Sequence, residues 1–238
     1  MMRSPNTTRV VIVDDHALFA ESMKIALGLE GYDVRLATPT THGRSHASLL
    51  SHILRLGPRV VLLDLDLGSF GNGVRLVQPL TCAGVAVIVV TGSAERPRWG
   101  EALRYGARKV MPKSAALEEI LATVRKVNDG RLVLAREERE ELLSEWHRHR
   151  SWVNAVRSRL ESLTHRESEV LAQLMEGHQV REIAQSSVVS VATVRTQVKS
   201  ILSKLEVSSQ LAAVGLAHQV EWESSPHVQI PEQRRPIA

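Results

Sequence analysis

Short apolar runs alternate with segments of helical spacing through the first half of this 238-residue chain. The strongest runs are VVIV at 10–13, VVLL at 60–63 and VAVIVV at 85–90, and weaker ones lie at 32–37 and 108–111. Runs rich in β-branched residues are typical of parallel strands buried on both faces. Helical spacing is found between and after them, at 17–28, 44–56, 72–80, 96–105 and 115–128. The alternation predicts a five-stranded parallel α/β sheet, doubly wound with helices on both faces.

Polar residues follow the strong strands and the fifth one. They are Asp14 and Asp15 after the first strand, Asp64 after the third, Thr91 after the fourth and Lys113 after the fifth. Ligands of open parallel sheets bind at these carboxyl ends. Carboxylates bind Mg²⁺, an aspartate can attack phosphorus, and hydroxyl and ammonium groups can hold phosphoryl oxygens. The plain alternative is a set of solvated strand ends, but their agreement in order and type favours a phosphoryl site.

The motifs IVDDH, LLDLDLG, VVTGS and VMPKS, within 9–128, resemble those of a response-regulator receiver domain, which has a flavodoxin-like fold. The resemblance implies that a histidine kinase transfers a phosphoryl group to Asp64 with Mg²⁺ bound. It further implies that Asp14, Asp15 and Asp64 hold the metal, together with the backbone carbonyl of Asp66. Of the two neighbouring aspartates, Asp64 then acts through its side chain and Asp66 through its main chain. Thr91 and Lys113 are the matching phosphoryl-site residues.

Three features depart from the receiver pattern. Val110 stands where the family often has an aromatic residue that relays phosphorylation, Lys109 stands where glycine is common, and GSFGNG replaces a proline-containing loop. A regulator that binds DNA independently of phosphorylation is therefore an alternative. The DLD motif with a later Thr and Lys is also similar to haloacid-dehalogenase-type phosphatases, in which the second aspartate is a general acid. In those enzymes an acidic pair follows late in the chain, whereas Asp14 and Asp15 precede the motif, so the order favours the receiver.

The second half predicts a helix-turn-helix over 163–219. Thr164 and Glu167 have capping-box spacing before an apolar stripe that ends at Gly177. A short helix is expected at 180–185, and Ser190 can cap a longer one that has no acidic residue from 191 to 205. Because five Lys/Arg stand against six Asp/Glu over 160–219, charge alone does not decide for DNA. Two short helices before a longer one with a basic face form a helix-turn-helix plan, but a basic helix face is more often a solvated surface, so these features alone leave DNA binding open.

The pattern LTHRESEVL, GHQVREIA and SVATVRTQVKSILSKLEV resembles the LuxR-type DNA-binding domain of the NarL/FixJ class of regulators. The resemblance implies double-stranded promoter DNA as a partner, read in the major groove by the longer helix. The candidate DNA-binding residues on this helix are Arg195, Thr196, Gln197, Lys199 and Lys204.

The segment between the two patterns, 130–162, predicts one long amphipathic helix. Its seam repeats at steps of four and three residues, through Leu142, Trp146, His149, Val153, Val156, Leu160 and Leu163. The seam either docks on the chain's own domains or pairs two copies in a parallel coiled coil, and both possibilities stay open.

Together these patterns predict a receiver domain at 1–129, the linker helix at 130–162, an all-α helix-turn-helix domain at 163–222 and a disordered tail at 223–238. The lone cysteine, Cys82, excludes an internal disulfide and is expected to be packed. No run approaches the ~18 apolar residues of a membrane span, so we expect a cytoplasmic protein with no membrane partner. The expected function is that of a transcriptional response regulator, not an enzyme. On this expectation, a histidine kinase phosphorylates Asp64, and the phosphorylation switches homodimerisation and promoter binding.

Overall fold

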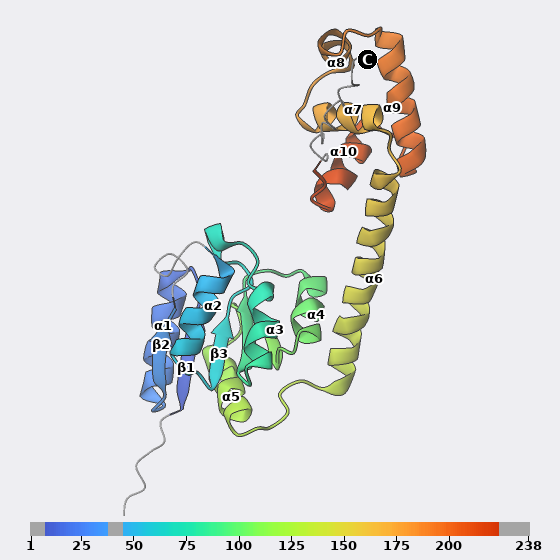
Figure 1. Cartoon of the computed structure of the whole chain (residues 1–238). Coiled ribbons are helices and arrows are strands. Elements are labelled where there is room, and N and C mark those ends of the chain that lie inside the picture. The colour runs from blue at the N-terminus through green and yellow to red at the C-terminus, as the bar shows by residue number, and fades with distance from the viewer. Residues whose placement is uncertain (1–7, 38–44, 224–238) are drawn as a thin grey trace, which may run out of the picture. The chain divides into compact units, whose positions relative to one another are not determined.

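The computed structural model describes residues 8–37 and 45–223. They form two compact units that divide between His149 and Arg150 (Figure 1). The first unit carries the predicted sheet of five parallel strands in the order β2-β1-β3-β4-β5. The strands are β1 (Arg9–Val13), β2 (Asp33–Leu36), β3 (Val60–Leu63), β4 (Ala86–Thr91) and β5 (Lys109–Pro112). This is the doubly wound order of the flavodoxin-like fold, so the predicted fold class is confirmed.

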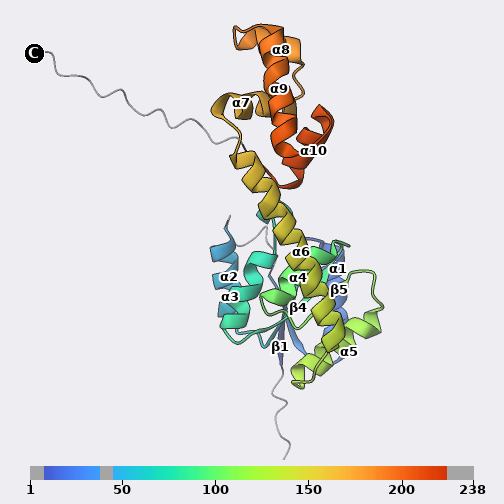
Figure 2. The ribbon, with the colours of Figure 1, turned by 90° about the vertical axis from the view of Figure 1, so that its right-hand side faces the viewer.

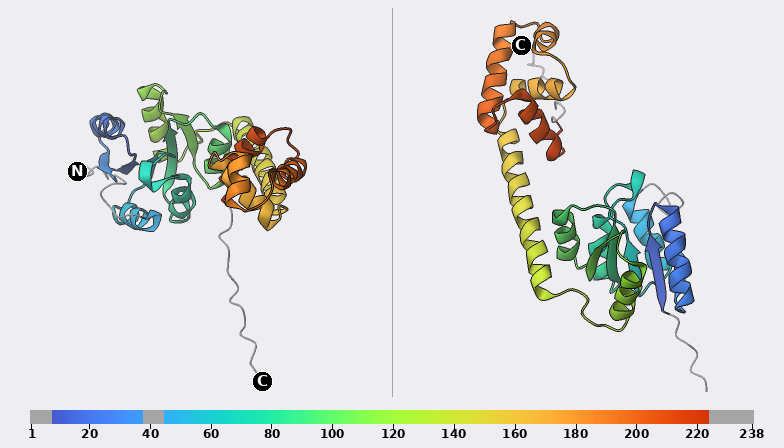
Figure 3. Two further views of the ribbon diagram at one scale, coloured as in Figure 1. Left: turned by 90° about the horizontal axis from the view of Figure 1, so that it is seen from above. Right: turned by 180° about the vertical axis from the view of Figure 1, so that it is seen from behind.

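Successive residues of each central strand point to opposite faces of the sheet, and both faces are covered. In β1, Val11 and Val13 join one apolar core while Val10 and Ile12 join the other. The first core lies against α2 (His46–Arg55), α3 (Val74–Cys82) and α4 (Arg96–Arg104), and the second against α1 (Ala17–Leu29) and α5 (Leu117–Asn128). Figure 3 shows the sheet between these two helix layers. Burial on both faces explains why the strands read as continuous apolar runs.

The long helix α6 (Arg136–Glu161) begins in the first unit and ends in the second. Its first half packs on α4, as Figure 2 shows. Leu142 is 2% exposed and belongs to the core on that face of the sheet, and Trp146 is 7% exposed. A Cβ on Gly100 of α4 would lie 2.2 Å from the Leu142 carbonyl oxygen, so the two helices approach as closely as glycine allows. Arg96 of α4 pairs with Glu141 and Glu145 of α6.

The second unit consists of the end of α6 with α7 (His165–Met175), α8 (Val180–Ser186), α9 (Val191–Leu205) and α10 (Gln210–Gln219). Its core includes Val156, Leu160 and Leu163, the last three members of the predicted seam. The seam is therefore buried within each unit, at Leu142 and Trp146 in the first and at these three residues in the second. These five residues dock on their own units, whereas His149 between them is exposed and Val153 is half-buried, so pairing of the seam with a second copy stays a prediction.

Several details differ from the sequence-based expectation. Residues 130–135 are not helical, because Gly130 takes a left-handed φ of 72° and ends α5 instead of beginning the long helix. The helix α10 is not predicted by the sequence patterns. Cys82 is exposed, so the prediction that it is packed was wrong. The predicted tail lies outside the described residues from 224 onward. None of the helices that the structure describes is both long and apolar enough to cross a membrane.

Candidate functional site

The predicted acidic cluster forms where β1 and β3 end. The two strands pair in the register Val13 to Leu63, and the Asp64 amide donates to the Val13 carbonyl at 2.9 Å. This register places Asp14 and Asp64 side by side directly beyond the strands. Both are buried, with 4% and 2% of their surface exposed. Buried carboxylates are rare unless they bind a cation or an ion-pair partner, so this pair marks a site.

Lys113 supplies the cation. It follows β5, and its amide donates to the Thr91 carbonyl at 2.8 Å, which joins the ends of β4 and β5. Its Nζ lies 2.8 Å from the Asp14 carboxylate and 2.6 Å from Asp64 Oδ2. The hydroxyl of Thr91, which is fully buried, accepts a hydrogen bond from the Ser93 amide. The structure thus brings all the predicted strand-end residues to one edge of the sheet.

Burial and charge act against each other on the ionisable groups of this cluster. Burial raises the pKa of Asp14 above its usual value, although hydrogen bonds from Lys113 and from the His16 amide oppose the rise. Burial would lower the pKa of Lys113, but its hydrogen bonds to Asp14 and Asp64 outweigh that effect and raise the pKa. The lysine therefore keeps its charge at neutral pH.

A divalent cation fits the residues present. Ligand atoms of Asp14, Asp15, His16 and Asp64 all lie within 4.8 Å of one another. Asp15 Oδ1 is shielded from solvent and accepts no hydrogen bond. His16 Nδ1 lies 2.8 Å from this oxygen but is not oriented to form a hydrogen bond with it. An unsatisfied, shielded carboxylate oxygen is costly without a partner, and hard cations such as Mg²⁺ take oxygen ligands. Sequence reasoning missed His16, and its only signal there was its position after the acidic pair.

Asp66 does not contribute its side chain to the cluster. Its carboxylate pairs with Arg98 of α4 at 2.8 Å and is 52% exposed, and the same guanidinium donates to the Leu65 carbonyl at 3.2 Å. The Asp66 amide donates to Asp64 Oδ1 at 3.2 Å. A general acid must reach the reacting group, so this arrangement disfavours the phosphatase alternative. It agrees with a main-chain role for Asp66.

The loop GSFGNG needs its glycines because it lies against the acidic cluster. Gly68 has a φ of 57°, and a Cβ there would lie 2.9 Å from Asp15 Oδ2. A Cβ on Gly73 would lie 2.1 Å from the Asp64 carbonyl oxygen. This loop, which replaces the proline-containing loop, therefore packs closely on the acidic cluster. Val110, the other notable departure, is 5% exposed and fills the core beneath α4.

In the second unit, α9 presents the candidate DNA-binding residues. Arg195, Thr196 and Lys199 are exposed, Gln197 is half-buried, and Val194, Val198 and Ile201 face the core. The side chain of Ser190 caps the helix by accepting from the Thr193 amide at 3.0 Å. An exposed face that combines Arg, Thr and Lys offers donors suited to base edges and phosphates.

Lys204 has a different partner. Its Nζ lies 2.6 Å from Glu167 Oε2 and also donates to the Ser162 carbonyl at 3.1 Å, so it joins α9 to the start of α7. Glu167, only 6% exposed, also accepts from Ser200 at 2.6 Å and from the Thr164 amide at 2.7 Å, which completes the predicted capping box. Burial alone would raise the pKa of Glu167, but these hydrogen bonds outweigh it and lower the pKa to about 2. Lys204 is therefore paired within the protein, and its role in DNA binding stays a prediction.

Comparisons with known proteins identify the family of each unit. The family model for the response regulator receiver domain matches residues 10–125, and the model for bacterial regulatory proteins of the luxR family matches 161–217. The transcriptional regulatory protein LnrK of Bacillus subtilis is 31% identical over 212 residues, which cover 86% of this chain and 94% of LnrK. LiaR of the same organism is 29% identical over 214 residues, 88% of this chain and 96% of LiaR.

Among solved structures, RcsB from Salmonella enterica serovar Typhimurium, bound to a promoter in the presence of the phosphomimetic BeF3-, is 22% identical with a TM-score of 0.48. The match covers 90% of this chain and 100% of that one. On the family matches and the likeness to LnrK, the chain belongs to the transcriptional response regulators that join a receiver domain to a LuxR-family DNA-binding domain.

Proposed function

We propose that Asp64 accepts a phosphoryl group from a sensor histidine kinase. The observation that carries the proposal is the buried Asp14–Asp64 pair with Lys113 between them. A carboxylate oxygen of Asp64 attacks the phosphorus of the phosphohistidine, a P–O bond forms, and the P–N bond breaks with the electron pair leaving on the imidazole nitrogen. The ammonium of Lys113 stabilises the charge on the transferred oxygens.

Mg²⁺ is the proposed cofactor, held by the carboxylates of Asp14, Asp15 and Asp64 and by the backbone carbonyl of Asp66. When bound, it neutralises negative charge on the phosphoryl oxygens. The shielded, unsatisfied oxygen of Asp15 and the small spread of the ligand atoms support this assignment. Because the Asp66 side chain pairs with Arg98, the main-chain carbonyl is the group of Asp66 that would contact the metal.

For the second unit we propose binding to double-stranded promoter DNA through α9. Arg195, Thr196 and Lys199 are the exposed residues that would reach base edges and phosphates, and Gln197 lies beside them. If Arg195 reads a base, its replacement by alanine should cost about 1–3 kcal/mol on the preferred site and relax specificity there. An equal loss on every sequence would make Arg195 a phosphate contact.

The two activities are coupled, in our proposal, by a shift between two populations of the protein in the cytoplasm. Phosphorylated Asp64 draws Thr91 inward, while Lys113, already 2.6 Å from Asp64, holds the phosphoryl oxygens. The altered face around α4 then changes what α6 can contact. The active form is a homodimer that binds two half-sites about one helical turn apart, or a multiple of it. The contacts of α6 with α4 support this route because they join the receiver directly to the helix that leads to the DNA-binding unit.

Phosphorylation from acetyl phosphate and Mg²⁺, followed on a phosphate-affinity gel, tests the proposal. Wild type should shift, Asp64→Asn should not, and the matched control Asp66→Asn should still shift because it keeps its backbone carbonyl. A protein that shows no shift but binds its promoter would support the phosphorylation-independent alternative. Hydrolysis of a generic phosphomonoester, lost in Asp66→Asn, would support the phosphatase instead.

A further inference from the structure

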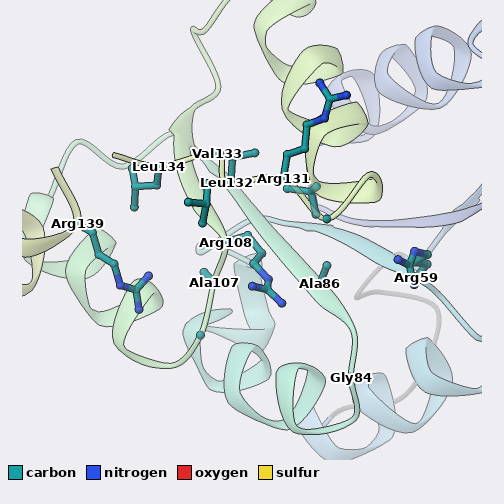
Figure 4. Close-up of a pocket in the computed structure, with 13 residues that line it drawn as sticks. Arg59, Gly84, Ala86, Ala107, Arg108, Arg131, Leu132, Val133, Leu134 and Arg139 are labelled. Carbon is teal, nitrogen blue, oxygen red and sulfur yellow. The ribbon is translucent and has the colours of Figure 1, made fainter. Parts of the chain in front are cut away.

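A cationic hollow lies at the opposite end of the sheet from the acidic cluster. Its volume is about 650 Å³. Arg59 and Arg108 precede β3 and β5, and Ala86 begins β4, so the hollow lies at the amino ends of these strands. The segment that leads from α5 to α6 forms another side of the hollow, through residues 130–134. Figure 4 shows Arg108 between Arg139 and Arg59, with Leu132 and Leu134 over it.

Most of the positive charge in this hollow has no carboxylate partner within the described part of the chain. Its lining includes four arginines, Arg59, Arg108, Arg131 and Arg139, and no Asp or Glu. Within the described part of the chain, the guanidinium groups of Arg59 and Arg108 pair with no carboxylate, and Arg139 donates to the Leu103 carbonyl at 3.1 Å. The carboxylate beside Arg131 belongs to Asp129 and lies 3.9 Å away.

Other arginines of the same unit behave differently. Arg9, Arg96 and Arg125 each pair with one or more carboxylates. Arg75 at the start of α3 is exposed and lines a smaller hollow, but the lining of that hollow includes the carboxylate of Glu101. What distinguishes the hollow is that the exposed Arg59 and Arg108 line one concavity together with the half-buried Arg139, so that an anion there can contact more than one guanidinium group.

The hollow also has an apolar side. Leu132 is 92% exposed, and Val133 and Leu134 beside it are half-buried. Gly84 and Gly130 line the same space with left-handed backbone, at φ values of 80° and 72°, so no side chain fills it there. A fully exposed leucine beside unpaired arginines favours a ligand that has both an apolar body and negative charge.

We propose that this hollow binds a small phosphorylated molecule of nucleotide size. Guanidinium groups bind phosphate oxygens in pairs of parallel hydrogen bonds, and their planes stack on flat rings. The volume lies within the range of about 300–1,000 Å³ that is usual for sites of such ligands. Arg59 and Arg108 bind the phosphates, and Leu132 covers the apolar body. Because Arg139 belongs to α6, a bound ligand also joins the receiver sheet to the start of that helix.

The test is titration of full-length protein into N-methylanthraniloyl-ATP, followed by fluorescence anisotropy. EDTA is present, so that the acidic cluster cannot bind the probe through Mg²⁺. We expect saturable binding of one probe per chain. The double variant Arg59→Gln, Arg108→Gln should weaken it by about a hundredfold or more, because it removes both charge-assisted contacts to the phosphates. The matched control Arg75→Gln should leave it unchanged.

Unlabelled competitors identify the chemistry. ATP should displace the probe better than tripolyphosphate does, and Leu132→Ser should remove that advantage without weakening tripolyphosphate. Equal competition by the two in wild type would overturn the assignment of an organic phosphate. Absence of saturation, or equal binding by the double variant and wild type, would overturn the site itself.

Discussion

The network around Glu167 makes a quantitative prediction for the DNA-binding unit. Glu167 accepts hydrogen bonds from Lys204, Ser200 and Thr164, and together these join α7, α9 and the cap of α7. The drop of its pKa from 4.5 in the unfolded chain to about 2 corresponds to about 3 kcal/mol of folding free energy. Because the folded-state pKa is the lower one, this stabilisation is present above pH 4.5 and is lost as the pH falls toward 2.

The variant Glu167→Gln should therefore lower the free energy of unfolding by about 2–3 kcal/mol at pH 7. The difference between wild type and variant should shrink as the pH falls from about 4.5 to 2, since the wild-type side chain then becomes neutral as well. The assay is urea unfolding of residues 150–223, a compact unit with its own core, followed by the fluorescence of Trp152 and Trp222.

Glu169→Gln on the same helix is the matched control. Its side chain is 41% exposed and pairs with Arg166 near the surface, so its loss should stay within about 0.5 kcal/mol. A difference between Glu167→Gln and wild type that is the same at pH 7 and at pH 3 would refute the electrostatic reasoning. In that case the loss would come from packing alone.

Two further predictions concern α4. Gly100→Val should separate α6 from α4, because a Cβ there would lie 2.2 Å from the Leu142 carbonyl oxygen and 2.8 Å from Trp146 Cβ. Amide hydrogen exchange in the first half of α6 should then become faster. Unchanged exchange there would contradict the contact. Arg98→Ala should release the loop that carries Asp66 and weaken the apparent affinity for Mg²⁺. The affinity is measured from the Mg²⁺ dependence of phosphorylation by acetyl phosphate. A change in thermal stability alone would mean that Arg98 has only a structural role.

The sequence predicts the first unit well because its signals are local and periodic. Every strand except β2 leads into a functional residue, and the parallel register then brings Asp14, Asp64 and Lys113 together at one edge. What it misses depends on long-range packing. Nothing local shows that Lys204 turns to Glu167, which lies 37 residues earlier.

The seam of α6 illustrates a different limit. Its spacing predicts a helix with an apolar face, but the same spacing suits a coiled coil and docking on a globular core. The difference comes from the partner surface. Gly100 lets α4 approach Leu142 and Trp146, and no pattern within the helix itself reports that glycine. The hollow of arginines is equally invisible in the sequence, because Arg59, Arg108 and Arg139 come from separate segments.

The most direct test of the central claim is the solution mass of the protein, measured by light scattering. Wild type and Asp64→Asn are compared in Mg²⁺ alone and in Mg²⁺ with beryllofluoride, a phosphoryl mimic. The account predicts that wild type changes from monomer to dimer with the mimic and that Asp64→Asn stays monomeric. Dimers under every condition, or a wild type that stays monomeric with the mimic, would contradict a switch of dimerisation controlled by Asp64.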